Sequence, residues 1–200
     1  MNEPKLVFAG TMGAGKTTAI SAISEIPPIS TDVANTDLDA HAKLATTVAL
    51  DYGEVTFGKN SKLRLYGTPG QDRFDFIWSL LARDALGVIL LVDNSRPAPL
   101  TDLNQYLDAF GDAIEQGRLV IGVGRMEEFP LPNLEAYLEH LDARQLLVPV
   151  IPVDVRRRED VLLLIESLFR QIECLLEVTT GGEPEDDWSE LVRTAREGSE

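Results

Sequence analysis

Residues 10–17 read Gly-Thr-Met-Gly-Ala-Gly-Lys-Thr and match the pattern G-x-x-x-x-G-K-[ST] in full. An apolar run at residues 6–9 precedes the motif, and residues 18–23, which have helical spacing, follow it. This order of strand, glycine-rich loop and helix is the context in which the pattern forms a phosphate-binding loop. The motif therefore predicts a strand-loop-helix unit that holds the phosphates of a nucleotide.

The residue types of the loop have physical reasons. Without Cβ atoms its glycines let the chain turn tightly, so that main-chain N–H groups converge on phosphate oxygens at the positive end of the helix dipole. The ammonium of Lys16 is expected to neutralise the outer phosphates, and the hydroxyl of Thr17 to coordinate magnesium. The predicted ligand contacts of this segment are Gly10, Gly13, Ala14, Gly15, Lys16, Thr17 and Thr18.

Composition fits a single globular domain in a chain of 200 residues, with 44% apolar and 26% charged residues. The net charge of −15 argues against binding to nucleic acid or to an anionic membrane surface. No apolar stretch reaches the roughly 18 residues of a membrane span, and no export signal is visible. We therefore expect a cytoplasmic protein without an integral membrane segment. Its one cysteine, Cys174, leaves no partner for an internal disulfide.

Near-continuous apolar strands alternate with helical patterns along the chain, which is typical of a parallel sheet buried on both faces. Strands are predicted at residues 5–9, 47–57, 62–66, 87–92, 119–123 and 148–151, with 47–57 and 62–66 forming a hairpin. Helices are predicted at residues 16–25, 72–83, 99–116, 132–142 and 159–177. The expected fold is a three-layer α/β domain with a mostly parallel six-stranded sheet flanked by helices.

Two segments lie outside this alternation. Residues 27–46 are polar and lack apolar periodicity, and a loop this long in a compact domain is usually functional. From residue 179 the composition becomes acidic and rich in glycine. We therefore predict one domain over residues 1–178 and an acidic, flexible tail over residues 179–200.

A second motif, Thr-Pro-Gly-Gln at residues 68–71, stands at the end of the predicted hairpin. Together with the phosphate loop and the polar loop ending in two threonines, it resembles the pattern of Ras-like small GTPases. The resemblance is to the bacterial group that works with roadblock-domain partners, and it covers about residues 5–177. It implies the P-loop NTPase fold of small G proteins, a GTP/GDP ligand with Mg²⁺, and GTP hydrolysis.

The resemblance also implies roles for particular residues. Thr47, with Thr46 as the alternative, would close over magnesium when the third phosphate is present. Gly70 would sense that phosphate through its N–H, and Gln71 would be the catalytic residue that orients the attacking water. Switch regions near residues 30–47 and 68–82 would then change with the bound nucleotide and contact partners.

Three departures from the family pattern bear on activity. Gly67 stands where relatives have an aspartate that holds a magnesium-bound water. Met12 replaces a glycine beside the γ-phosphate and can crowd Gln71, so intrinsic hydrolysis is expected to be slow. Arg73 is the nearest arginine that this chain could supply to the reaction, but the favoured alternative is a solvated surface arginine at the start of a helix.

The base-recognition segment departs most. Relatives read N-K-x-D, whose aspartate accepts two hydrogen bonds from guanine, whereas residues 124–127 here read Gly-Arg-Met-Glu. Glu127 can still accept those bonds, and the stem of Arg125 can stack on a base. The loop Asp154, Val155 and Arg156 resembles the one that offers main-chain N–H groups to the base. Guanine and adenine both stay open at this stage.

Apolar surface points to protein partners. The segment around Phe74, Phe76, Ile77, Trp78, Leu80 and Leu81 is where a roadblock-type partner would bind, unless it packs on its own sheet. The last helix adds Leu162, Leu163, Phe169 and Leu176 beyond one apolar stripe, through wide burial or docking. The alternatives to a GTPase switch are a degenerate scaffold of the same fold with altered or no hydrolysis, and an ATP-dependent small-molecule kinase.

Overall fold

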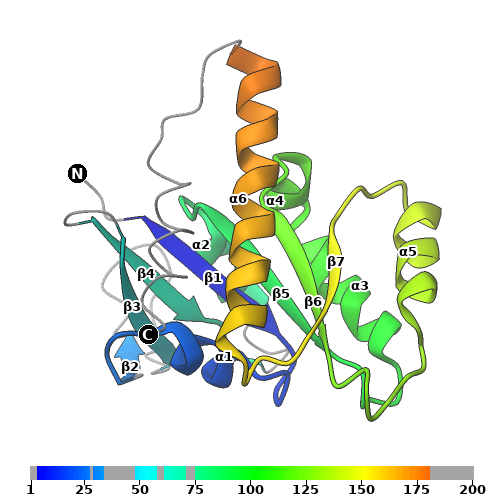
Figure 1. Ribbon diagram of the computed structural model, residues 1–200, viewed down its shortest axis with the longest axis horizontal. Coiled ribbons are helices and arrows are strands. Elements are labelled where there is room, and N and C mark those ends of the chain that lie inside the picture. The colour runs from blue at the N-terminus through cyan, green and yellow to red at the C-terminus, as the bar shows by residue number, and fades with distance from the viewer. Residues whose placement is uncertain (1–3, 28, 34–47, 58–60, 71–74, 181–200) are drawn as a thin grey trace.

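The computed structural model describes residues 4–27, 29–33, 48–57, 61–70 and 75–180. In this part of the chain, seven strands form one sheet in the order β2-β3-β4-β1-β5-β6-β7 (Figure 1). The strands are β1 (Lys5–Gly10), β2 (Ile29–Val33), β3 (Val48–Phe57), β4 (Ser61–Gly67), β5 (Gly87–Asp93), β6 (Leu119–Gly124) and β7 (Val150–Val153). Strands β4, β1, β5, β6 and β7 run parallel, and β2 and β3 pair antiparallel.

Helices cover both faces of the sheet. They are α1 (Lys16–Ile23), α2 (Asp75–Ala82), α3 (Pro99–Ala109), α4 (Gly111–Glu115), α5 (Leu134–Ala143) and α6 (Arg158–Thr180). One hydrophobic core joins the sheet to α1 and α6, and a second joins its other face to α2, α3 and α5. The predicted three-layer α/β architecture is confirmed.

The first strand shows why the sheet is buried on both sides. Leu6 and Phe8 of β1 belong to the core under α1 and α6, whereas Val7 and Ala9 belong to the core on the opposite face. Successive side chains of a strand point to opposite faces, so a strand covered on both faces must be apolar throughout. All four side chains are fully buried.

Two elements differ from the prediction. The six predicted strands are present, and β2 adds a seventh at the edge, where its main chain pairs with β3 (Thr31 opposite Leu50). The sequence predicts a loop here, within residues 27–46, because an edge strand needs only main-chain pairing and no apolar pattern. The single helix predicted at 99–116 is divided into α3 and α4 at Phe110, whose side chain is buried in the core.

The last helix is longer than predicted. It ends at Thr180, so residues 179 and 180 of the predicted tail are helical, and residues 181–200 lie outside the described residues. Its Leu162 and Phe169 are buried in the domain's own core, which favours burial over docking, whereas Leu163 is exposed. None of the helices in the described ranges has the length and apolar composition that crossing a membrane requires.

Candidate functional site

The glycine-rich loop connects β1 to α1 at the carboxyl end of the central strand, where ligands bind in sheets of this kind. Gly10 has φ 138°, and a Cβ there would lie 2.2 Å from the carbonyl oxygen of Leu91 on β5. Gly15 caps α1 with φ 94°, and its Cβ would lie 2.7 Å from Val155. Both positions therefore require glycine, as the motif predicts.

Lys16 is held at the centre of the loop. Its side chain is buried, and Nζ donates to the carbonyl oxygens of Gly10 and Thr11, each at 2.8 Å. Burial lowers the pKa of Lys16 from 10.5 to about 8, and the negative charge of Asp51 opposes that shift. The ammonium is thus pre-positioned and poorly hydrated, so an anion in front of it would interact strongly.

A cavity of about 330 Å³ opens in front of the lysine. It is lined by Met12, Gly13, Gly15, Lys16, Thr17, Thr18, Asp51, Gly67, Thr68, Pro69 and Gly70. The loop after β4 closes one side, because the N–H of Met12 donates to the oxygen of Gly70 at 3.2 Å. A Cβ on Gly70 would come within 2.5 Å of the Met12 nitrogen, so only glycine allows this approach.

Thr17 has a partner that sequence reasoning missed. Its hydroxyl donates to Oδ2 of Asp51, on β3, at 2.5 Å. Asp51 is the register partner of Gly67, the position where the family pattern has its aspartate. The signal available in the sequence was an acidic residue on the strand that pairs with β4, whose own end lacks the acid of the family pattern.

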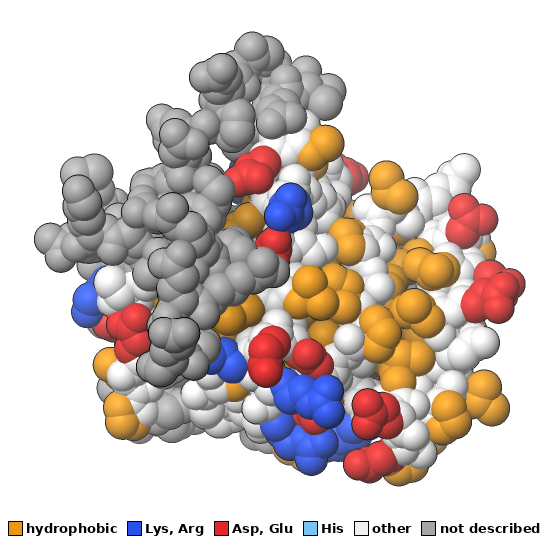
Figure 2. All heavy atoms as spheres, in the orientation of Figure 1, with side chains coloured by type: hydrophobic (Ala, Val, Ile, Leu, Met, Phe, Trp, Pro, Cys, Tyr) orange, Lys and Arg blue, Asp and Glu red, His pale blue; other side chains and the backbone are white. Residues whose placement is uncertain are grey.

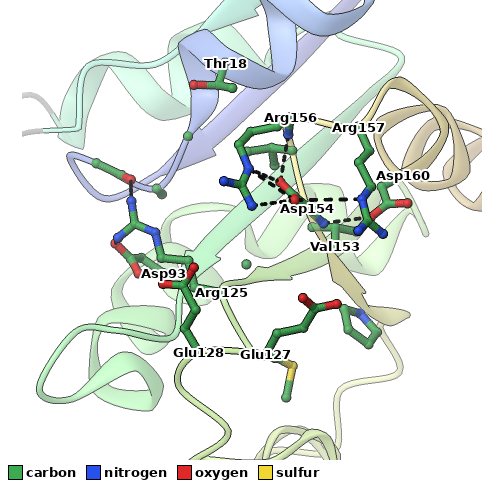
Figure 3. Close-up of a pocket in the computed structure, with 17 residues that line it drawn as sticks. Thr18, Asp93, Arg125, Glu127, Glu128, Val153, Asp154, Arg156, Arg157 and Asp160 are labelled. Atoms are coloured by element: carbon green, nitrogen blue, oxygen red, sulfur yellow. Dashed lines mark hydrogen bonds and ion pairs between the residues drawn. The ribbon is translucent and has the colours of Figure 1, made fainter.

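A second cavity, of about 320 Å³, lies on the other side of the loop (Figure 3). It is lined by Gly13, Ala14, Gly15, Thr18, Asp93, Gly124, Arg125, Met126, Glu127, Glu128, Pro152, Val153, Asp154, Val155, Arg156, Arg157 and Asp160. Thr18 and Glu127 lie at opposite ends of this view. The two cavities share Gly13, Gly15 and Thr18, so they meet at the phosphate loop.

Arg125 fastens the base-recognition segment to the phosphate loop. It has a φ of 62°, and its guanidinium donates to Oδ2 of Asp93 at 2.7 Å, to Ser95 Oγ at 3.0 Å and to the oxygen of Gly13 at 3.2 Å. The guanidinium therefore turns toward the loop. Asp93, at the end of β5, was not predicted as a site residue.

The loop after β7 forms the facing wall. The Asp154 carboxylate accepts from the Arg156 side chain, at 2.8 Å from Nε and 2.7 Å from Nη2, and this contact lowers the pKa of Asp154 to about 2. The N–H groups of Asp154 and Arg156 are taken by the carboxylates of Asp160 and Asp154. Val155 is therefore the residue of this loop whose N–H can face a ligand.

Asn94 positions the segment after β6. It is buried, its Nδ2 donates to the oxygens of Phe129 and Pro132 at 2.6 Å and 3.0 Å, and its Oδ1 accepts from Tyr137 at 2.6 Å. A buried amide with all these partners fixes the loop that carries Glu127.

The face in Figure 2 shows Lys and Arg side chains gathered at its lower edge beside acidic ones.

Most of the predicted site residues come together around the two cavities. Gly10 does not line either cavity and instead supports the loop from β1. Thr46, Thr47, Gln71 and Arg73 lie outside the described residues, so their roles stay predictions.

Residues 8–111 match a family described as conserved hypothetical ATP binding protein. The chain belongs to this family. Among curated proteins, this family member is similar to Ras-related protein RabC of Dictyostelium discoideum, with 22% identity over 178 residues that cover 86% of this chain and 85% of the relative. It is 25% identical to Ras-related protein SEC4 of Saccharomyces cerevisiae over 64% of this chain and 61% of SEC4. It is 34% identical to Ras-related protein Rab-8A of Gallus gallus over 52% of this chain and 45% of Rab-8A.

Among solved structures, the fold of this family member resembles the G domain of the T. maritima FeoB iron transporter. The TM-score is 0.60 at 18% identity, with 85% of this chain and 99% of the other covered. This likeness confirms the fold. The Ras-related matches agree with the resemblance to small P-loop GTPases, whereas a bacterial origin and roadblock partners stay predictions.

Proposed function

We propose that this chain is a nucleotide-dependent molecular switch that binds GTP with magnesium and hydrolyses it slowly to GDP. The observation that carries the proposal is the continuity of the two cavities across Gly13, Gly15 and Thr18. One side offers the buried ammonium of Lys16, and the other ends at the carboxylate of Glu127. A nucleotide, with phosphates at one end and a base at the other, matches this arrangement.

Magnesium fits the residues on the phosphate side. Thr17 and Asp51 offer a hydroxyl and a carboxylate, the oxygen ligands that Mg²⁺ prefers, and nucleotide phosphates usually complete its coordination. Bound there, the ion would neutralise the phosphates during their transfer. Lys16 and the N–H groups of the loop would hold those phosphates in place.

Guanine fits the base side because of Glu127. An ionised carboxylate only accepts hydrogen bonds, and guanine presents two neighbouring donors, N1–H and the N2 amino group. Adenine presents an acceptor, N1, at the corresponding edge, so a carboxylate facing it would be left unpaired at a cost of about 1–3 kcal/mol. The family description names ATP, and the choice of base is therefore the first point to test.

Slow hydrolysis follows from the placement of Met12. Its side chain is 69% exposed, lines the cavity, and its N–H contacts Gly70, the residue before Gln71. A bulky side chain there would crowd the glutamine that orients water in this class of reaction. A cytoplasmic location and a flexible tail that follows helix α6 are part of the same proposal.

The switch regions, near residues 30–47 and 68–82, would present different surfaces in the two nucleotide states to a partner of roadblock type. Trp78 is a buried core residue, which corrects its assignment to the docking cluster. Leu80 of α2 is 52% exposed and remains available to a partner, and Ile77 is half-buried.

Fluorescent GTP, GDP and ATP analogues titrated into the full chain test the ligand. We expect GTP and GDP to bind at least about fivefold more tightly than ATP, from the unpaired-acceptor cost above. Equal affinity would overturn the guanine assignment, and no binding at all would overturn the switch.

Phosphate release from GTP then tests the enzyme. We expect slow release that falls further in Gln71→Ala and rises in Met12→Gly. Nucleotide binding without any release, unchanged by either variant, would favour the degenerate scaffold, which the departures at Gly67 and Gly124 support.

A further inference from the structure

The side chain of Asp51 lies beside Gly67, close to where a side chain at position 67 would begin. The two residues are register partners in the antiparallel pair of β3 and β4. A Cβ on Gly67 would lie 3.0 Å from Cβ of Asp51, 3.1 Å from its Oδ2 and 3.2 Å from Cδ1 of Ile20. These distances are all closer than ordinary van der Waals contact. A side chain at position 67 would therefore force the Asp51 carboxylate to shift by a few tenths of an ångström from its present position.

The carboxylate that fills this space faces the phosphate loop. Its Oδ2 accepts from the Thr17 hydroxyl at 2.5 Å, and it lines the same cavity as Lys16 and Gly70. A threonine hydroxyl that donates its proton to a carboxylate keeps its lone pairs free for a cation. The hydrogen bond therefore orients Thr17 as a ligand and brings a full negative charge beside it.

This inference rests on the proposed function: we propose that Asp51, on β3, supplies the carboxylate of the magnesium site. The family pattern has that carboxylate at the end of the neighbouring strand β4, where this chain has Gly67. Asp51 orients the Thr17 hydroxyl, and its carboxylate would stabilise the ion in place of an acid at position 67. The absence of a side chain at Gly67 is what makes room for it.

The test measures how much free Mg²⁺ is needed to retain a bound nucleotide. The full chain is loaded with a fluorescent GDP analogue, and the release rate is followed across buffered Mg²⁺ concentrations and in excess EDTA. Asp51→Asn keeps the shape of the side chain but removes its charge. The exchange variant Asp51→Gly/Gly67→Asp returns one carboxylate to the same space from the other strand.

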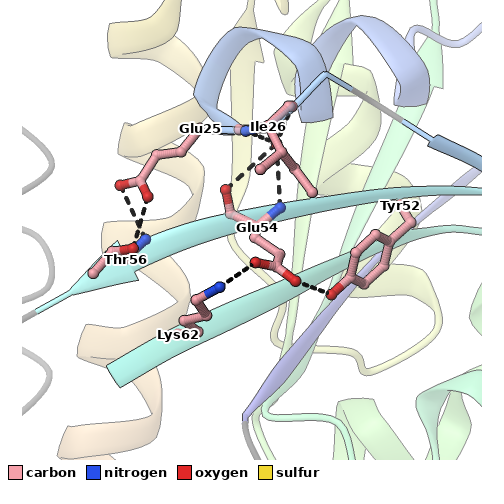
Figure 4. A network of polar contacts seen from close by, with 7 residues as sticks. Glu25, Ile26, Tyr52, Glu54, Thr56 and Lys62 are labelled. Carbon is pink, nitrogen blue, oxygen red and sulfur yellow. Dashed lines mark hydrogen bonds and ion pairs between the residues drawn. The ribbon is translucent and has the colours of Figure 1, made fainter. Parts of the chain in front are cut away.

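Glu54→Gln is the matched control (Figure 4). Glu54 lies on the same strand, and its carboxylate accepts from Tyr52 Oη at 2.5 Å and from Lys62 Nζ at 2.7 Å, among residues that do not line the phosphate cavity. The variant loses one acidic charge from β3 without touching Thr17. Circular dichroism and release rates in EDTA report whether each variant is folded and holds nucleotide without metal.

We expect Asp51→Asn to need at least about tenfold more free Mg²⁺ for half-maximal retention, which is the usual loss when a group supporting a metal ligand is removed. The release rate in EDTA should be unchanged, and Glu54→Gln should need the same free Mg²⁺ concentration as the parent. The exchange variant should need a free Mg²⁺ concentration within about threefold of the parent's. Should Asp51→Asn fail to fold, Gly67→Ala, which forces the carboxylate to shift without removing it, should change the Mg²⁺ requirement in the same direction.

The outcomes separate the two levels of the proposal. A parent protein whose nucleotide release is insensitive to Mg²⁺ overturns the magnesium part of the proposed function, and this assignment with it. If nucleotide release depends on Mg²⁺ in the parent and to the same degree in Asp51→Asn and Gly67→Ala, only the role of Asp51 is overturned. An exchange variant no better than Asp51→Asn would also contradict it, because a carboxylate in that space would then have no effect.

Discussion

Arg125 donates a hydrogen bond from Nη2 to the main-chain oxygen of Gly13 at 3.2 Å, although the two residues are 112 positions apart. The contact joins the segment after β6 to the phosphate loop. The same guanidinium bonds to Asp93, whose side chain is 7% exposed. One side chain thus holds the two halves of the candidate site together.

We predict that Arg125→Ala weakens GTP and ATP binding by the same factor, about fivefold. A charge-assisted hydrogen bond from a half-exposed side chain contributes about 1 kcal/mol, and this one supports the loop rather than the base. Titration with the two fluorescent analogues measures the ratio. Arg157→Ala is the control, because Arg157 lines the same cavity, whereas its side-chain ion pair within the described residues is a long one, to Asp154 at 3.9 Å. A changed GTP to ATP ratio would mean that Arg125 contacts the base.

Glu127→Gln, in contrast, is expected to change the ratio of GTP affinity to ATP affinity. The glutamine side chain has one acceptor and one donor group, so it can pair with only one of the two adjacent guanine donors and turns its own donors toward the other. We expect GTP affinity to fall about tenfold or more while ATP affinity holds or rises. Glu128→Gln, at the next position of the same cavity, should leave both affinities unchanged. If only Glu128→Gln changes the ratio, the base is read by the neighbouring carboxylate.

The fold could be predicted from the sequence because the residue patterns that indicate it are local. A strand such as β5, which is buried on both faces, must be apolar along its run at residues 87–92. The phosphate-loop motif likewise specifies its own flanking strand and helix. Residues 29–33 carry no such signal, since the edge strand β2 is defined by pairing with β3.

The site was harder to predict from sequence where its geometry depends on strand register or on a turn. Asp51 meets Thr17 only because β3 and β4 pair Asp51 with Gly67, and one sequence does not state that register. Stacking of the Arg125 stem on a base stays a prediction, whereas the contacts of its guanidinium with Asp93 and Gly13 had no signal in the sequence. Both assignments require contacts between distant residues.

Trp78 provides an internal probe of the loop that contains Gly70. The indole is fully buried, stacks on Tyr106 with ring centres 4.3 Å apart, and donates from Nε1 to the oxygen of Pro69 at 3.0 Å. We predict that Trp78 fluorescence differs between GDP and a non-hydrolysable GTP analogue, since a third phosphate next to Gly70 would shift its neighbour Pro69.

The chain has two tryptophans, so the measurement uses Trp188→Phe, which leaves Trp78 as the single emitter. Trp78→Phe, which retains Trp188, is the control and should give no nucleotide-dependent change. Identical emission in the two nucleotide states of Trp188→Phe would show that the loop after β4 does not respond to the third phosphate.

Lys16 should make nucleotide binding depend on pH. Burial lowers its pKa to about 8 in the free folded protein, against 10.5 ordinarily, so the folded state releases this proton at lower pH than the unfolded state does. Between those values the unfolded chain binds more protons, and this group's contribution to stability rises with pH. Phosphates in front of the ammonium favour its charged form and raise the pKa again. Binding therefore takes up a proton, and affinity declines as the pH rises above about 8.

Calorimetry with GDP in EDTA, in two buffers of different ionisation enthalpy, counts that proton. At pH 8 about half of the free protein carries neutral Lys16, so we expect uptake of roughly half a proton, because phosphate groups with a pKa of about 6 are already ionised there. Lys5→Gln is the control: burial also lowers the pKa of Lys5, but this residue starts β1 at the end away from the loop. Uptake that disappears in Lys5→Gln, or that is zero in the parent, would contradict the assignment to Lys16.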